Sequence, residues 1–234
     1  MSFIVILACI AVQWFLNLGS TAYQFQWAGG YVSWMRRKFS ALAQGHALFG
    51  VLLLVLPVVI AASLVFTIVY HLLGHVGYLV LSLLLLWYCI DAVILKQSSA
   101  SSTSALFVQS YQKLFAPLFW YFVFGPVGLV LYVTVATLRT QLSTEKFFGL
   151  TLGVLDWVPI RIVGLTFALA GNFGAVFKVW AKNVFQNVAD NQNQVKVYGE
   201  AALSTDSTAF NLVFRAILIW LVIMLLITVA HWFG

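Results

Sequence analysis

The sequence predicts an all-α protein, a polytopic bundle of transmembrane helices with about six membrane segments. Hydrophobic residues make up 63% of the 234 residues, charged residues make up 8%, and the mean hydropathy is +1.01. A soluble domain is about 45–50% apolar and about 25% charged. Backbone groups in hydrocarbon need partners within their own segment, which favours helices, and the alternating segments of a membrane barrel are not evident. We expect residues 1–234 to form a single integral membrane domain.

Each apolar segment has roughly the 17–25 residues that cross about 30 Å of hydrocarbon. The first has no Lys or Arg before it and no clear cleavage site, so we interpret it as a retained helix. His71–His75 is short enough only for a tight reversal, and Gly125–Pro126 predicts a hinge or kink. No internal repeat is evident. In chain order the segments are Ser2–Gly19, His46–Tyr70, Val76–Leu95, Ala116–Leu138, Phe147–Ala170 and Leu212–Trp232.

The connections between these segments differ in kind. The interfacial loop 20–45 carries several aromatic residues beside the basic cluster Arg36–Lys38, which is typical of a helix at headgroup level. Residues 97–105 form a Ser-rich linker, and residues 187–208 are expected to be a polar, solvent-exposed loop.

The charge balance points to a membrane and not to nucleic acid. Twelve Lys and Arg residues against six Asp and Glu give a net charge of +6. The cations lie at segment ends, where they suit cytoplasmic loops and anionic headgroups. If all segments cross and the N-terminus is outside, nine cations lie inside and two outside. Cys9 and Cys89 lie in apolar runs as small hydrophobes, and no metal site or cofactor is predicted.

The fifth segment contains the unusual stretch "LDWVPIR", Leu155–Arg161. Pro159 lacks an N–H, and its ring clashes with the Leu155 carbonyl in a regular helix. Asp156 precedes the proline by three residues and suits an N-cap that accepts from the Val158 N–H. The sequence therefore predicts two half-helices, broken between Asp156 and Pro159. The break is either a ligand or substrate site near the midplane or a capped kink neutralised by its neighbours.

A charge inside the membrane needs a partner or access to water. At 1.5 Å of rise per residue, Asp91 and Arg161 fall at similar depths in the third and fifth segments. We therefore predict an Asp91–Arg161 pair; the alternative is that both reach the cytoplasmic interface separately. The candidate residues for a polar intramembrane cluster or ligand site are Gln13, Asn17, Asp91, Asp156, Pro159, Arg161 and Asn172.

Three stretches resemble the AmpE membrane proteins of Gram-negative bacteria. They are "FAPLFW" (Phe115–Trp120), "VLDWVPIR" (Val154–Arg161) and "GLTFALAGNFGAVFKVW" (Gly164–Trp180). That family is described as a modulator of β-lactamase induction. The resemblance implies a multi-pass protein of the bacterial inner membrane with a signalling, regulatory or envelope role. Besides the lipid bilayer, a second copy, a membrane partner protein or a small-molecule ligand would be its partners.

AmpE proteins are distantly similar to the CobD/CbiB cobalamin-biosynthesis proteins, which join an aminopropanol group to the corrinoid. Those proteins carry an Asp-Arg pair near the end of the first helix and carboxylates before "PLFW". Here the matching stretches, Gln13–Gly19 and Val108–Lys113, contain no acid. An ATP-using condensation needs acids to hold Mg²⁺ and move protons, so we favour a non-catalytic role. The alternatives are a ligand-binding protein or enzyme related to the cobinamide-phosphate synthases, or a small transporter.

Overall fold

A computed structural model describes residues 2–16, 26–38, 47–93, 102–142, 146–184, 191–203 and 208–233. Every regular element in these ranges is helical, which confirms the all-α prediction. The elements are α1 (Ser2–Leu16), α2 (Gln26–Lys38), α4 (Ala47–Cys89), α6 (Thr103–Ser110), the π-helix η2 (Tyr111–Phe115), α7 (Ala116–Gln141), α8 (Lys146–Ala170), α9 (Phe173–Asn183), α10 (Asn191–Ala202) and α11 (Ala209–Phe233).

The arrangement is that of a helical membrane bundle. Large apolar side chains cover much of its outer surface, as in Leu72, which is 77% exposed, and Leu226, which is 62% exposed. Four helical stretches in the described ranges have the length and composition to cross a membrane, where the sequence suggested about six segments. Two of the expected segments are joined within α4, and the first is a shorter helix. The four are Gly50–Cys89, Thr103–Gln141, Phe147–Ala170 and Ala209–Phe233, and Phe3–Leu16 is a shorter apolar helix.

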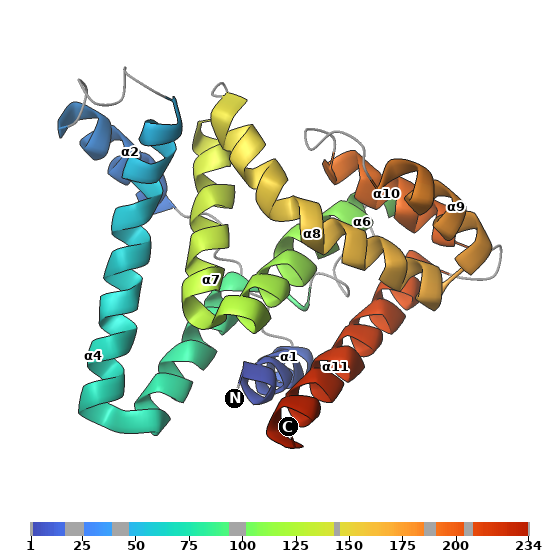
Figure 1. Cartoon of the computed structure of the whole chain (residues 1–234), viewed down its shortest axis with the longest axis horizontal. Helices are drawn as coiled ribbons and strands as arrows, with labels where there is room; N and C mark the ends of the chain where they lie inside the picture. The colour runs from blue at the N-terminus through green and yellow to red at the C-terminus, as the bar shows by residue number, and fades with distance from the viewer. Residues whose placement is uncertain are drawn as a thin grey trace.

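Two glycines divide α4 and α7 into arms. Gly74 has φ 67° and ψ −156°, and Gly125 has φ 66° and ψ −154°. This region of backbone space is accessible almost only to glycine, since a Cβ would clash there. Figure 1 shows α4 descending to a sharp turn and rising again, and α7 bending sharply. The tight reversal expected at His71–His75 and the hinge expected at Gly125–Pro126 are both confirmed.

The two turns share a five-residue pattern that the sequence analysis missed. It reads Leu73-Gly-His-Val-Gly77 in α4 and Phe124-Gly-Pro-Val-Gly128 in α7. A Cβ on Gly77 would lie 2.4 Å from the Leu73 Cβ, and one on Gly128 would lie 2.6 Å from the Phe124 Cβ. The second glycine of each pair therefore makes room for the residue before the turn. Only three positions are identical, which is too few to stand out in an apolar sequence.

Helix α8 is continuous, so the prediction of two half-helices broken at Asp156–Pro159 is wrong. Asp156 is a mid-helix residue and its carboxylate accepts hydrogen bonds from tyrosine hydroxyl groups on other helices. The proline lies inside the helix, where it is buried.

Two side chains bind carbonyl oxygens of α8 in the turns before Pro159, whereas the carbonyl that lacks its usual N–H partner is that of Leu155. The Asn191 Nδ2 donates to the carbonyl oxygen of Gly153 at 2.6 Å, and the Arg161 Nη1 donates to that of Trp157 at 3.1 Å. Proline is tolerated in membrane helices where neighbouring helices and local adjustment offset the lost hydrogen bond. The prediction failed because it weighed the hydrogen bond lost at Pro159 without the packing of α8 against α7, α10 and α11.

Helices α9 and α10 together form a unit that we call the cap. The cap and α6 lie together beside the later part of α8 (Figure 1). Gly164 permits this approach, because a Cβ there would lie 2.7 Å from the Tyr198 Cδ2 and 2.8 Å from the Trp180 Cδ1. Since α10 occupies the middle of residues 187–208, that part is helical and not the polar loop expected.

The other expected connections agree in part with the structure. Helix α2 falls within the interfacial loop 20–45, where a helix was expected. The Ser-rich linker 97–105 ends in helix, because Ser102 caps α6 by accepting from the Ala105 N–H. Residues 94–101 lie outside the described ranges.

We predict that Gly125→Ala lowers the free energy of unfolding in detergent by about 1–3 kcal/mol, the usual cost of holding a side-chain-bearing residue in this backbone region. Thermal unfolding followed by intrinsic tryptophan fluorescence would measure it. The control is Gly50→Ala in α4, where no atom lies within 4 Å of the added Cβ. Equal melting temperatures for the two variants would contradict the assigned turn.

Candidate functional site

Asp156 in α8 is a buried carboxylate held by two tyrosines. The Tyr111 hydroxyl donates to the Asp156 Oδ1 at 2.6 Å, and the Tyr132 hydroxyl donates to the same oxygen at 3.1 Å. All three side chains are buried, with exposed fractions of 2% or less. Because they come from η2, α7 and α8, this carboxylate ties three helical elements together.

The π-helix η2 sets the direction of the first tyrosine. A π turn accommodates one more residue than an α turn, which changes the faces on which its side chains project, and such turns are frequent at functional sites. From η2, Tyr111 reaches Asp156, whereas Lys113 reaches Asp91. One irregular turn therefore serves two polar contacts.

Arg161 connects α8 to the C-terminal end of α9 and to the first residue of α10. Its Nε donates to the Val184 carbonyl at 3.1 Å, and its Nη1 donates to the Asn191 Oδ1 at 2.9 Å. The guanidinium carbon lies 4.8 Å from the centroid of the Trp157 ring, within the range of a cation–π contact. Arg161 is only 6% exposed, so these groups replace much of the water that a free guanidinium would bind.

Tyr198 lies where α10 crosses Gly164. Burial raises the pKa of its phenol, and the positive charge of Arg161 lowers that pKa by a smaller amount. The hydroxyl therefore stays protonated at neutral pH and donates to the Gln194 Oε1 at 3.3 Å. This contact lies within α10 and stiffens the face that packs on α8.

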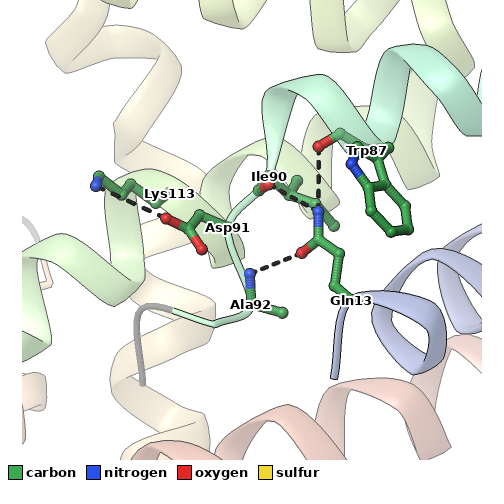
Figure 2. Close-up of polar contacts among 6 residues, drawn as sticks. All are labelled: Gln13, Trp87, Ile90, Asp91, Ala92 and Lys113. Atoms are coloured by element: carbon green, nitrogen blue, oxygen red, sulfur yellow. Dashed lines mark hydrogen bonds and ion pairs between the residues drawn. The ribbon is translucent and has the colours of Figure 1, made fainter. Parts of the chain in front are cut away.

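Asp91 follows the end of α4 and forms an ion pair with Lys113, as Figure 2 shows. The Lys113 Nζ lies 4.0 Å from the Asp91 Oδ2, and the Asp91 N–H donates to the Lys113 carbonyl at 3.2 Å. The predicted pair between Asp91 and Arg161 is therefore wrong. The other carboxylate oxygen, Oδ1, is buried without a hydrogen-bond partner among the described residues.

Gln13 holds the end of α4 in place (Figure 2). Its Nε2 donates to the carbonyls of Trp87 at 3.1 Å and Ile90 at 3.0 Å, and its Oε1 accepts from the Ala92 N–H at 2.9 Å. Carbonyls at a helix C-terminus lack partners within the helix, and Gln13 supplies them from α1. Its described hydrogen bonds therefore fix the segment that carries Asp91 and do not reach Asp156.

The remaining predicted residues are Asn172 and Asn17. Asn172 is exposed and caps α9, since its Oδ1 accepts from the Ala175 N–H at 3.2 Å. Asn17 lies outside the described residues. The expected single cluster is thus three groups, around Asp156, Arg161 and Asp91. Whether any of them binds a ligand stays a prediction.

The sequence analysis did not identify four residues that bind Asp156, Asp91 or Arg161 in the structure. Tyr111 and Lys113 lie in a stretch noted only for its lack of acids, and Tyr132 lies in an apolar run. Asn191 belongs to the segment expected to be a loop. In the described ranges, no three His, Cys, Asp or Glu side chains are placed so that they could hold a metal ion.

The fold and these contacts define a helical membrane protein with polar groups enclosed between its helices. A family model described as regulatory signalling modulator protein AmpE matches residues 96–230, more than half of the chain. The chain therefore belongs to the AmpE family, as its three motifs predicted. Neither the curated proteins nor the solved structures gave a match. The matched region contains Tyr111, Asp156 and Arg161, whereas Gln13 and Asp91 precede it.

We predict that Tyr111→Phe lowers the free energy of unfolding by about 1.5–3 kcal/mol, because it removes a buried hydrogen bond to a carboxylate. Tyr132→Phe should have a smaller effect, since its contact is longer. Chemical unfolding in detergent of Tyr111→Phe, Asp156→Asn and the double variant gives the coupling between the two residues. Additive losses would argue against the contact.

Proposed function

We propose that the protein is a non-catalytic, multi-pass regulator of the bacterial inner membrane, in which α8 couples the cap to the membrane helices. The observation that supports this role is the position of Arg161. It belongs to a membrane-length helix, and its guanidinium donates to the Asn191 side chain of the cap.

The two polar groups of α8 face different parts of the molecule. Asp156 accepts from Tyr111 and Tyr132, which belong to the membrane helices. Arg161, five residues later, engages the cap. A cap movement that withdrew Asn191 would leave the buried guanidinium of Arg161 with fewer hydrogen-bond acceptors, which is costly in an apolar surrounding. The cap and the membrane helices would therefore change state together, which is what coupling between two sites requires.

The family description supports a role in signalling, and β-lactamase induction in a Gram-negative bacterium is the process in which we propose that it acts. The cap offers a surface for a partner. Phe173 and Phe177 on α9 are stacked at 5.4 Å and are 52% and 43% exposed. We propose that this surface contacts a second copy, a membrane partner protein or lipid headgroups, and that a small molecule could bias the same contact.

We predict that Arg161→Ala and Asn191→Ala reduce β-lactamase induction several-fold in a Gram-negative host that lacks its own AmpE-family gene. Both changes remove the hydrogen bond between the Arg161 guanidinium and the Asn191 side chain. Asn191→Asp keeps an acceptor for Arg161 and should retain more of the response than Asn191→Ala. Lys178→Ala, an exposed change on α9, is the control and should behave as the parent.

The induction measurement is read beside protein abundance in isolated membranes. A normal response from Arg161→Ala at normal abundance would contradict coupling through α8.

The orientation of the cap gives a separate test. Lys178, Lys182, Lys196 and Arg215 follow α8, whereas only Arg139 and Lys146 flank its start. Basic residues favour the cytoplasmic side, so the cap is expected in the cytoplasm. Cysteines introduced at Lys182 and Lys196 should escape an impermeant maleimide on spheroplasts and react after lysis. One at Glu145, which lies outside the described residues, should react from outside.

The two native cysteines are buried, which keeps the background of this labelling low. Labelling of positions 182 and 196 on intact spheroplasts would reverse the proposed orientation.

A further inference from the structure

Residues close to both glycine turns line one cavity, which has a volume of about 260 Å³. Both arms of α4 contribute to its wall, and the remainder comes from α7 at its own turn, including Pro126. The turns are close together here, since a Cβ on Gly125 would lie 3.8 Å from the Tyr78 Oη. In membrane proteins, a pair of interrupted helices at matching positions points to a binding site.

Half of the residues that line the cavity are aromatic. The Phe66 and Tyr78 rings meet edge to face with centroids 5.5 Å apart, and Tyr70 and Tyr78 meet at 6.3 Å with an interplanar angle of 89°. Phe124 closes the wall from α7. The face of an aromatic ring carries partial negative charge, so rings grouped around a cavity attract a cation.

Hydroxyl groups accompany the rings. The Ser63 and Tyr78 hydroxyls line the cavity and make no hydrogen bond within the described part of the chain. The Tyr70 hydroxyl lies 3.4 Å from the His75 Nε2, and the Thr67 hydroxyl donates to the Ser63 carbonyl. A hydroxyl without a partner is unfavourable in hydrocarbon. The Ser63 and Tyr78 oxygens can accept hydrogen bonds from a ligand that carries N–H donors.

The charge of the wall decides between ligand classes. None of the lining residues is Lys, Arg, Asp or Glu, so a phosphate or carboxylate would find no counter-charge there. An ammonium group would find aromatic rings and the hydroxyl oxygens of Ser63 and Tyr78.

The exposed residues of the cavity wall indicate the side from which a ligand enters. Phe124 is 63% exposed and Tyr70 is 42% exposed, on stretches long and apolar enough to lie in the bilayer. A ligand therefore enters from the membrane. We propose that this cavity binds the ammonium headgroup of a phospholipid, phosphatidylethanolamine. The proposal does not depend on the signalling role of α8.

Native mass spectrometry of the purified protein in detergent tests the proposal. The protein is incubated with equal amounts of phosphatidylethanolamine and phosphatidylglycerol that carry the same acyl chains. We expect phosphatidylethanolamine to be retained about three- to tenfold more, as a few cation–π contacts would give. Tyr78→Leu and Phe124→Leu should abolish this preference. Phe233→Leu, at an exposed ring far along the chain in α11, should leave it unchanged.

Two more conservative variants test the proposal if the leucine variants fold poorly. Phe124→Trp retains a ring and should retain the preference, and Tyr78→Phe should weaken it by loss of the hydroxyl alone. Equal retention of the two lipids by the parent protein would overturn the proposal. So would a preference that survives Phe124→Leu in a protein that melts at the parent temperature, because the rings would then not recognise the headgroup.

Discussion

Hydrocarbon offers a polar side chain only the partners that neighbouring helices supply, and α8 places a carboxylate, a proline and a guanidinium within six residues of one another. The rest of the bundle is arranged to meet that demand. Tyr111 and Tyr132 converge on Asp156 from two other elements. Asn191 reaches Arg161 and a carbonyl before the proline. The packing of α7, η2 and the cap on α8 is therefore inseparable from the hydrogen bonds of α8.

Much of the fold could be predicted, because hydropathy over a membrane-length window averages out local detail. The apolar stretches were found in this way, and Gly74 and Gly125 marked the reversals because few other residues adopt such backbone angles. The continuity of α8 could not be predicted. The helices that pack on α8 are distant in the sequence, as the Asn191 donor to the Gly153 carbonyl is at 38 residues, so the sequence alone does not show that this helix can contain its proline.

The pairing of Asp91 failed for a geometric reason. The equal depths of Asp91 and Arg161 assume that both residues lie in straight helices. In the structure α4 ends at Cys89, and Asp91 lies beyond it. Its position is set by Gln13 and by the η2 backbone, which accepts from its N–H, and not by helical rise. Asp91 then pairs with Lys113. A depth calculated from helical rise applies inside a helix and not to a residue beyond its end.

The turn η2 links the part of the chain that matches the AmpE family to the part that precedes it. Tyr111 and Lys113 are two residues apart in this turn, and they bind Asp156 of α8 and Asp91 after α4. A regular α-helix would place these two side chains roughly 200° apart around its axis, and the wider π turn changes that relation. Straightening η2 would therefore disturb both contacts at once. Because α1 fixes the Asp91 segment through Gln13, the N-terminal helix also bears on the geometry around Asp156, although it shares no described hydrogen bond with α8.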